Sequence, residues 1–349
     1  MGWENNVRRV VPYVPGEQPK KADVIKLNTN ENPYPPSLEA EKAAASMSTD
    51  ELRLYPDPSA ESLVRAIAGC YGLKENEVFV GVGSDDVLAM CFMTFFNSGK
   101  PIVFPDITYS FYDVWADLLR IPYKTPPLTE DFRINPADYR GENGGIVFPN
   151  PNAPTGSFLP MESVEEIVAA NRESVVIVDE AYVDFGAESA LPLIRKYDNL
   201  IVVQTFSKSR SMAGLRIGYA MADEKLIRYL NDVKYSFNSY TLNRPSILIG
   251  TAEMNSREHF KECCARIAKT REASAARFRG LGFSLTDSCA NFLFVTHPDK
   301  TAKEIFDYLK ENRIYVRWFD KPRIRNYLRV TIGTDQEMDR LFACLSELF

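Results

Sequence analysis

The sequence predicts an α/β protein in which a large doubly wound domain, with a mostly parallel sheet between helices, precedes a smaller α+β domain. Three observations lead to this fold class. Short runs of Val, Ile and Phe recur through the first two thirds of the chain, and several are continuous, as in parallel strands buried on both faces. Amphipathic stretches of helical length separate these runs. After about residue 243 the order changes, because one long helical pattern is followed by shorter strands.

The elements of the large domain alternate along the chain. Helices are expected at 37–47 and 59–71, and in the second Leu63, Ile67 and Cys70 recur at helical spacing. Strands are predicted from the apolar runs at 78–82, 101–105, 145–149, 175–179, 200–206 and 217–222. Further helices fit between these strands at 85–97, 109–119, 161–172 and 223–235. This alternation is typical of βαβ units, which build a parallel sheet.

The last third of the chain has a different pattern. A long helix is predicted over 256–280, followed by helices at 300–312 and 335–348. Shorter strands are expected at 283–286, 291–296, 314–318 and 327–332. We therefore divide the chain into an extended arm that packs with the small domain, the large domain and the small domain, at 1–36, 37–243 and 244–349.

Composition argues against several classes of function. The 41 Lys and Arg residues against 47 Asp and Glu give a formal net charge of −6 without a basic block, so no nucleic-acid surface is expected. Two histidines give little material for a metal site or a Ser-His-Asp triad, and no metal is expected. The six cysteines form no C-x-x-C pair, which favours a reducing cytoplasm. No signal-peptide pattern is seen, and the longest apolar run, 87–96, is too short to span a membrane.

Chemically active side chains follow two of the predicted strands. Strand 175–179 ends in Asp179, and strand 200–206 is followed by Ser207-Lys208, with Arg216 further on. Open α/β sheets bind ligands at the carboxyl ends of their strands. Pyridoxal phosphate needs a lysine for a Schiff base, a carboxylate for its pyridine nitrogen, and cations with a helix N-terminus for its phosphate. The sequence supplies a candidate for each of these needs, so we predict this cofactor.

Several motifs strengthen this prediction. The chain resembles the fold-type-I aminotransferases in TFSKSRSMAGLRIGYA, VVIVDEAYVDF and NPNAPTG. It is closer still to the histidinol-phosphate aminotransferases of that family in LNTNENPYPPS, LRLYPDP, GVGSDDVL and NYLRVTIGT. The similarity runs from Val7 to the C-terminal helix. It implies a large domain with a seven-stranded sheet between helices, the cofactor pyridoxal 5′-phosphate, and a cytoplasmic homodimer that acts on small molecules in histidine biosynthesis.

The resemblance assigns cofactor-binding roles to individual residues. Lys208 would carry the Schiff base and move the proton at the substrate Cα, Asp179 would pair with the pyridine nitrogen, and Tyr182 would donate to the phenolic oxygen. Tyr109 would stack on the ring, and Tyr55 would reach the active site of the neighbouring subunit. The phosphate would lie at the helix opened by GVG, among Ser84, Asp85, Ser207 and Arg216. Because Asp85 has the wrong charge for a phosphate ligand, we expect it to order its neighbours.

The resemblance also implies a substrate side of the site. Arg329 matches a family arginine whose planar fork would pair with either the glutamate carboxylate or the phosphate of histidinol phosphate. Tyr13 and Asn32 on the arm resemble substrate-binding residues. The reaction would be a ping-pong transamination between glutamate and imidazole-acetol phosphate.

One position departs from the family pattern. Relatives usually have Asn directly before the Pro of Asn-Asn-Pro-Thr-Gly, where it bonds the phenolic oxygen of the cofactor. Here that position is Ala153, and Asn152 precedes it. Our hypothesis is that Asn152 takes over the hydrogen bond after a local adjustment of the backbone.

Other functions stay open at this point. Threonine-phosphate decarboxylases resemble the same family, but TNENP replaces their glycine-rich N-terminal signature here. An aromatic amino-acid aminotransferase would use Arg329 for a carboxylate alone. A regulator that binds the cofactor without catalysis would carry an appended helix-turn-helix segment, and none is recognised. A nicotinamide dehydrogenase would have no use for Lys208 and Asp179, and GVGSDD lacks the third glycine of a dinucleotide fingerprint.

Overall fold

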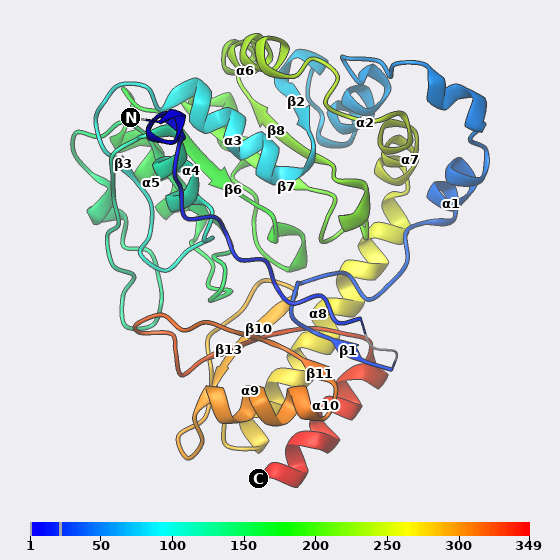
Figure 1. Ribbon diagram of the computed structural model, residues 1–349, viewed down its shortest axis with the longest axis vertical. Coiled ribbons are helices and arrows are strands. Elements are labelled where there is room, and N and C mark those ends of the chain that lie inside the picture. Colours follow the sequence, from blue (N-terminus) through cyan, green and yellow to red (C-terminus); the bar gives the residue numbers. More distant parts are fainter. Residues whose placement is uncertain (1, 21–22) are drawn as a thin grey trace.

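A seven-stranded sheet dominates the computed structural model, which describes residues 2–20 and 23–349 (Figure 1). The strand order is β2-β8-β7-β6-β5-β3-β4. Its strands are β2 (Val78–Gly81), β3 (Ile102–Val103), β4 (Tyr123–Lys124), β5 (Ile146–Pro149), β6 (Val176–Asp179), β7 (Leu200–Thr205) and β8 (Gly218–Ala222). Strand β8 is antiparallel to β2 and β7, and the other pairings are parallel. The predicted fold class, a mostly parallel sheet with helices, is confirmed.

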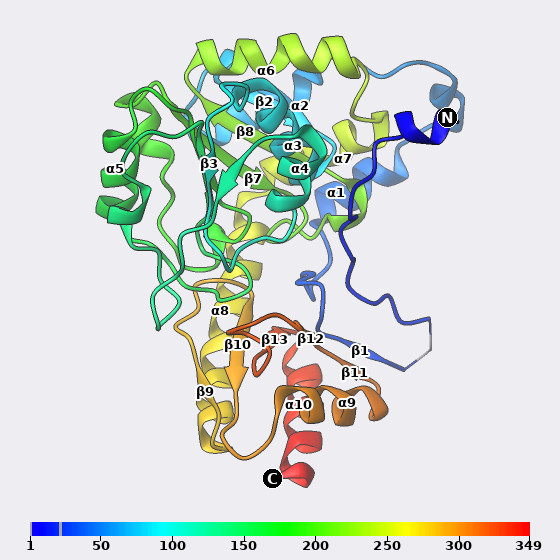
Figure 2. The same ribbon diagram turned by 60° about the vertical axis from the view of Figure 1, so that its left-hand side comes forward.

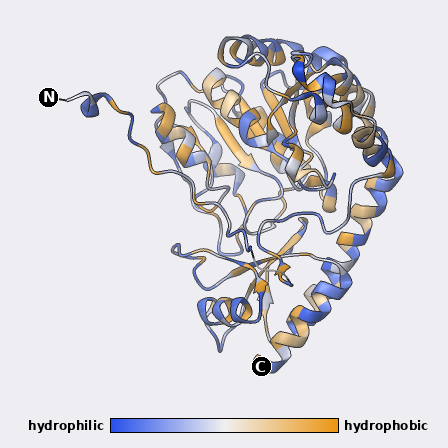
Figure 3. Cartoon of the chain, turned by 45° about the vertical axis from the view of Figure 1, so that its right-hand side comes forward, coloured by the Kyte–Doolittle hydropathy of each residue, from blue (hydrophilic) through white to orange (hydrophobic). Residues whose placement is uncertain are grey.

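Helices cover both faces of this sheet (Figures 1 and 2). One face packs against α3 (Gly83–Phe95), α4 (Tyr112–Leu119) and α6 (Glu224–Phe237). The other face packs against α2 (Glu61–Tyr71), α5 (Met161–Ala170) and α7 (Arg244–Asn255). Within β6, Ile177 belongs to the first core and Val178 to the second, and both are fully buried. Burial on two faces explains the continuous apolar runs of the sequence. In Figure 3 the strands of this sheet carry the orange colour of hydrophobic residues.

A smaller antiparallel sheet follows in the C-terminal part. Its order is β12-β13-β10-β9, formed by β9 (Ser284–Leu285), β10 (Phe292–Thr296), β12 (Arg317–Trp318) and β13 (Leu328–Thr331). Its core is shared with helices α8 (Arg257–Gly280), α9 (Ala302–Glu311) and α10 (Asp335–Leu348). Helix α8 extends from the part of the molecule that holds the large sheet to the part that holds the small sheet (Figures 1 and 2).

The N-terminal arm is tied to the C-terminal part by a two-stranded pairing. Strand β1 (Ile25–Lys26) runs parallel to β11 (Ile314–Tyr315), and the N–H of Leu27 donates to the carbonyl of Tyr315 at 2.7 Å. This contact agrees with an arm that packs with the small domain, although residues 1, 21 and 22 lie outside the described residues. The domain boundaries at 36/37 and 243/244 stay a prediction.

Short connecting elements complete the chain. Helix α1 (Leu38–Ala45) packs on α7. Single 3-10 turns occur at η1 (Trp3–Asn6), η2 (Thr49–Arg53), η3 (Glu75–Glu77), η4 (Pro136–Tyr139), η5 (Val183–Phe185), η6 (Leu191–Arg195) and η7 (Ala213–Leu215). Among the helices that the structure describes, none has the length and apolar character needed to cross a membrane.

Helix α7 was not predicted, although its start signals are present in the sequence. The side chain of Asn243 accepts a hydrogen bond from the N–H of Ser246, and Pro245 lies in the first turn. No element is predicted for this segment, which opens the predicted small domain at residue 244. Strands β1 and β4 have two residues each, which is too short for any periodic pattern.

Close backbone packing at Gly218 provides a test of this fold. A Cβ at Gly218 would overlap the backbone of Gly83 and Ser84, where β8 crosses the start of α3. We expect Gly218→Ala to lower the free energy of unfolding by about 2 kcal/mol, as overpacking does. Urea denaturation measures the change. The control is Gly69→Ala, which enters open space in helix α2 and should stabilise by up to about 1 kcal/mol. Equal stability of Gly218→Ala and wild type would contradict the close approach.

Candidate active site

A cavity of about 360 Å³ opens at the carboxyl ends of the central strands. Its walls combine an amine, carboxylates, hydroxyls, a guanidinium and two aromatic rings. Eight residues predicted from the sequence line it: Ser84, Asp85, Tyr109, Asp179, Tyr182, Ser207, Lys208 and Arg216. The arm contributes Gln18, Thr29 and Glu31, which the sequence did not single out. The remaining lining residues are Pro149, Ala153, Ala181, Ala213 and Gly214.

The two reactive groups of this cavity come from neighbouring strands. Strands β6 and β7 pair in parallel, with Asp179 opposite Val203, so their carboxyl ends lie at one edge of the sheet. Asp179 is the last residue of β6, and Lys208 lies three residues beyond β7. The amine Nζ of Lys208 donates to the carbonyl of Thr29 at 3.0 Å. The arm therefore reaches the lysine directly.

Asp179 is a carboxyl group buried beneath the cavity. The hydroxyl of Tyr112 donates to its Oδ2 at 2.9 Å, and the N–H of Ala181 donates to Oδ1 at 3.2 Å. Burial raises the pKa of Asp179 from 3.8 to about 6, and these two hydrogen bonds act in the opposite direction. A positive charge placed against this carboxylate would be stabilised. Tyr112 was missed in the sequence because it resembles any other apolar position of helix α4.

A helix N-terminus and a guanidinium face each other at another wall of the cavity. Helix α3 begins at Gly83, and Nη2 of Arg216 lies 2.5 Å from the position that a Cβ of Gly83 would take. A side chain at this position would be strained, since φ is +84°, and would displace the guanidinium. The guanidinium donates to the hydroxyl of Ser207 at 3.4 Å. The free N–H groups of the helix start and this cation form a site for an anion.

Asp85 is held by two partners at the same place. Its Oδ1 accepts a hydrogen bond from the hydroxyl of Tyr109 at 2.7 Å, and its Oδ2 lies 3.5 Å from Nη2 of Arg216. Burial and the negative charge of Asp85 raise the pKa of Tyr109 well above its ordinary value, so this phenol stays protonated. The arrangement agrees with the expectation that Asp85 orders its neighbours.

Tyr182 is oriented by a residue of the arm. The amide Nδ2 of Asn30 donates to the Tyr182 hydroxyl at 2.9 Å. Asn30 is held in turn by Thr331 of β13, whose hydroxyl donates to Asn30 Oδ1 at 2.9 Å and accepts from its N–H at 3.0 Å. Asn30 was missed in the sequence. Its signal lay in the motif TNENP, from which we selected only Asn32.

Asn152 lies beside the cavity without lining it. Its amide Nδ2 donates to the carbonyl of Ile107 at 3.1 Å and to the hydroxyl of Thr155 at 2.8 Å, so both hydrogens are in use. Its Oδ1 is buried with no hydrogen-bond partner among the described residues. Ala153 lines the cavity instead. A hydrogen bond from Asn152 to a cofactor would require these contacts to change, and that role stays a prediction.

Arg329 faces a second arginine that the sequence analysis did not select. Arg317 of β12 and Arg329 of β13 are direct cross-strand partners. Burial lowers the pKa of Arg329, and the charge of Arg317 lowers it further. The Nε of Arg329 is buried without a hydrogen-bond partner in the described part of the chain. Two like charges directly opposite each other are destabilising unless an anion joins them. Arg317 was missed because strand pairing, not sequence spacing, brings the two together.

The remaining predicted residues lie outside the cavity lining. The ring of Tyr13 stacks on Phe111 at 4.2 Å, so the arm covers helix α4. The amide of Asn32 donates to the carbonyls of Lys208 and Ser209, each at 3.2 Å. Asn32 thus contacts the backbone of the lysine loop. Tyr55 is 78% exposed and packs against Tyr240 at 4.7 Å.

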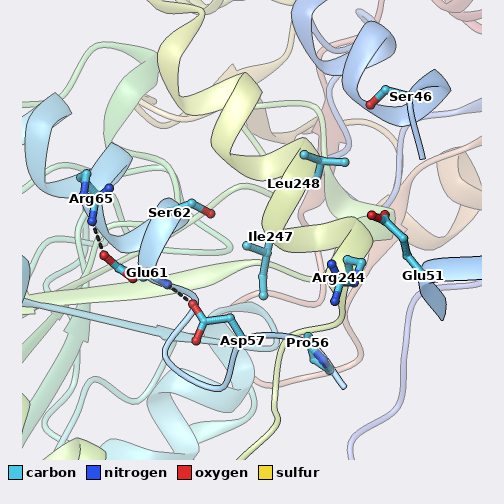
Figure 4. Close-up of a pocket in the computed structure, with 10 residues that line it drawn as sticks. All are labelled: Ser46, Glu51, Pro56, Asp57, Glu61, Ser62, Arg65, Arg244, Ile247 and Leu248. Carbon is cyan, nitrogen blue, oxygen red and sulfur yellow. Dashed lines mark hydrogen bonds and ion pairs between the residues drawn. The ribbon is translucent and has the colours of Figure 1, made fainter. Parts of the chain in front are cut away.

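A second cavity of about 510 Å³ lies next to the Tyr55 loop (Figure 4). Its lining residues are Ser46, Glu51, Pro56, Asp57, Glu61, Ser62, Arg65, Arg244, Ile247 and Leu248. Several of its charged groups are already satisfied, since Arg65 pairs with Glu61 and Asp57 accepts from the N–H of Glu61. It holds no lysine or aromatic ring beside a buried carboxylate. The chemistry therefore belongs to the cavity at Lys208.

Comparison with known proteins places this architecture in a family. The model of class I and II aminotransferases matches residues 22–345. The chain belongs to this aminotransferase family. Among its relatives, histidinol-phosphate aminotransferase 1 of Hydrogenovibrio crunogenus (strain DSM 25203 / XCL-2) is 53% identical over 99% of this chain and 97% of that protein. The histidinol-phosphate aminotransferase of Lactococcus lactis subsp. cremoris (strain MG1363) is 49% identical over 99% of this chain and 98% of that protein.

A solved structure shows the same fold. The histidinol-phosphate aminotransferase of Sinorhizobium meliloti, in complex with pyridoxal-5′-phosphate, superposes with a TM-score of 0.85 at 25% identity. The similarity covers 93% of this chain and 90% of that one. The relatives named above thus share one enzyme name, and the predicted resemblance to this family is confirmed.

The buried carboxyl of Asp179 predicts a pH-dependent stability of the cofactor-free protein. Because the folded-state pKa of about 6 exceeds the ordinary 3.8, its favourable contribution is present below pH 4 and is lost as pH rises through 6. Asp179→Asn removes this titration. The quantity to compare is the free energy of unfolding of the variant minus that of the wild type. Between pH 4 and pH 7.5 this difference should increase by up to about 3 kcal/mol.

Urea denaturation at both pH values measures this difference. Burial also raises the pKa of Glu180, to about 7. Because Glu180 titrates in both the variant and the wild type, its contribution cancels in the difference. A difference that is the same at both pH values would contradict the raised pKa of Asp179.

Proposed function

We propose that this protein is a pyridoxal-phosphate-dependent aminotransferase that exchanges the amino group between glutamate and histidinol phosphate. In the biosynthetic direction it would form histidinol phosphate from imidazole-acetol phosphate. The observation that carries the proposal is that Lys208, Asp179 and Arg216 line one cavity in a chain of the aminotransferase family. The name shared by relatives about half identical over 99% of the chain supports the substrate.

The cavity fits pyridoxal phosphate at each of its functional groups. The buried carboxyl of Asp179 suits the pyridine nitrogen, and the hydroxyl of Tyr182, oriented by Asn30, suits the phenolic oxygen. The start of α3 and Arg216 suit the phosphate, and the ring of Tyr109 offers a stacking surface. When bound, the cofactor accepts the electron pair left when a bond at the substrate Cα breaks.

Lys208 is the residue that would move the proton. Among the described residues, its Nζ donates to one protein acceptor, the Thr29 carbonyl at 3.0 Å. As a free amine it would take the proton from the substrate Cα and become an ammonium. The carboxylates of Asp179 and Glu31 lie close enough to interact electrostatically with Lys208.

Arg317 and Arg329 support an anionic substrate on the side of the small sheet. Their cross-strand contact leaves two positive charges without a carboxylate partner in the described residues. A carboxylate carries one negative charge, whereas a phosphate monoester carries between one and two at neutral pH. We propose that Arg329 pairs with either substrate and that Arg317 adds its charge mainly for the phosphate. Tyr13 lies near enough to Arg329 to act on its charge and would complete this wall.

We also propose a homodimer in which Tyr55 reaches the partner's active site. Its side chain is exposed, and so are its sequence neighbours Leu52 and Leu54 and its packing partner Tyr240. Such a patch favours an interface between copies. Six cysteines without disulfides agree with a cytoplasmic enzyme.

Removing the proposed lysine tests the reaction. Lys208→Ala should abolish turnover, at least about 1,000-fold, because no other amine lines the cavity described here. The measurements are turnover and the absorbance spectrum during titration with histidinol phosphate, glutamate and phenylalanine. The yellow colour of bound cofactor should bleach with the first two substrates in wild type only. Lys196→Ala, an exposed lysine paired with Glu165, is the control and should keep normal turnover.

Two outcomes would contradict this function. Bleaching by phenylalanine but not by histidinol phosphate would favour an aromatic aminotransferase. Normal turnover by Lys208→Ala would remove the central assignment.

The arginine pair predicts a difference between the two substrates. Loss of a charge-assisted hydrogen bond costs about 1.5–3 kcal/mol, so Arg317→Ala should raise KM for histidinol phosphate roughly 10- to 100-fold. The KM for glutamate should change by less than about 3-fold, since Arg329 remains. The exposed Arg325, paired with Asp320, provides the control Arg325→Ala, for which both KM values should stay near wild type. Equal losses for both substrates in Arg317→Ala would contradict the division of roles.

A further inference from the structure

The loop that carries Lys208 is followed by two polar residues that are unexpectedly buried. Ser209 and Arg210 are each 2% exposed, although they lie in a connection between strands. Loops usually keep such side chains in water, since burying a charge costs free energy unless it is compensated. Their burial therefore requires a specific partner inside the protein.

Asp184 is the partner of Ser209. The Ser209 hydroxyl donates to Asp184 Oδ2 at 2.6 Å, a short hydrogen bond to a carboxylate. Asp184 lies in turn η5, five residues beyond Asp179 on the segment that follows β6. One segment of the chain thus supplies both the carboxyl beneath the cavity and the carboxyl beneath the lysine loop.

Arg210 is buried between aromatic rings next to the same loop. Its guanidinium lies 4.1 Å above the ring of Phe260 in α8 and 5.6 Å from the ring of Phe206. Its Nε and Nη1 have no hydrogen-bond partner among the described residues. Burial raises the pKa of Asp184, and the charge of Arg210 and the Ser209 hydroxyl act against that rise. The positive charge of Arg210 therefore favours the ionised form of Asp184, which accepts the hydrogen bond from Ser209.

The opposite side of the loop is held by the arm. The amide of Asn32 donates to the carbonyls of Lys208 and Ser209, and the N–H of Ser211 donates to the Lys208 carbonyl at 3.4 Å. The backbone at Lys208 is consequently fixed from the arm on one side and from Asp184 on the other. Neither contact uses the Nζ atom, which stays available to a substrate.

We propose that Asp184 is a positioning residue for Lys208, acting through the Ser209 hydroxyl and the buried Arg210 guanidinium. The proposal rests on the proposed function, in which Lys208 Nζ takes the proton from the substrate Cα. A lysine side chain has four rotatable bonds, so the direction of Nζ depends on a fixed backbone. Displacement of about 1 Å at a reacting atom lowers a rate by up to 100-fold.

The test uses the holoenzyme with glutamate carrying hydrogen or deuterium at Cα. Ser209→Ala removes the hydrogen bond with little change in volume. We expect kcat to fall about 10-fold or more, KM for glutamate to stay within about 2-fold, and the deuterium isotope effect on kcat to increase. The isotope effect increases because proton transfer becomes the slow step. Loss of folded protein alone would lower the rate without changing that isotope effect.

A matched control is available next to this loop. The hydroxyl of Ser189 donates to the buried carboxyl of Glu180, also at 2.6 Å, and forms no hydrogen bond with residues 207–211 in the described part of the chain. Ser189→Ala should leave kcat and the isotope effect near wild type. Asp184→Asn keeps an acceptor for Ser209 but removes the charge opposite Arg210, and it should show the same signature as Ser209→Ala.

The outcomes separate this proposal from the proposed function. A wild-type protein that does not transaminate overturns the proposed function itself. An active wild type, together with unchanged kcat and isotope effect in both Ser209→Ala and Asp184→Asn, overturns the positioning role alone. Equal effects in Ser189→Ala and Ser209→Ala also overturn it, because they would reflect general destabilisation.

Discussion

The parallel pairing of β6 with β7 is the contact on which the active site depends. It brings the last residue of one strand, Asp179, to the same edge of the sheet as the loop that follows the other, with Lys208. Strand β8 then returns antiparallel beside β7 and brings Arg216 to the start of α3. Asp179 therefore meets two groups of the segment between β7 and β8, Lys208 and Arg216, at one edge of the sheet.

Several charged groups around the active site are buried rather than solvated. Asp179, Asp184 and Arg329 all have pKa values displaced by burial, each toward its neutral form. Arg210 and Ser209 compensate Asp184 inside the protein. Asp179 and Arg329 have no such oppositely charged partner in direct contact among the described residues, and both lie where a ligand would supply one. Asp184, whose charge is compensated within the chain, supports the structure of the site. Asp179 and Arg329, whose charges are not compensated, are available to bind a ligand.

The N-terminal arm joins the two sheets at the active site. Asn30 orients Tyr182, Thr29 accepts from Lys208, and Asn32 holds the backbone of the lysine loop. The same segment is anchored to the C-terminal part by β1 and β11. Any shift of the small sheet relative to the large one would consequently be transmitted to the residues around Lys208.

The sequence by itself determined the fold class and eight of the cavity-lining residues. Continuous apolar runs report burial on two faces, and the motifs around Asp179 and Lys208 are local in sequence. Only the tertiary structure decided the residues whose partners are distant. Arg317 becomes significant through pairing with Arg329, Tyr112 through its hydrogen bond to Asp179, and Asn30 through Tyr182. The physical reason is that a hydrogen bond or charge contact depends on distance in space, whereas a sequence pattern reports only which face of its own element a residue occupies.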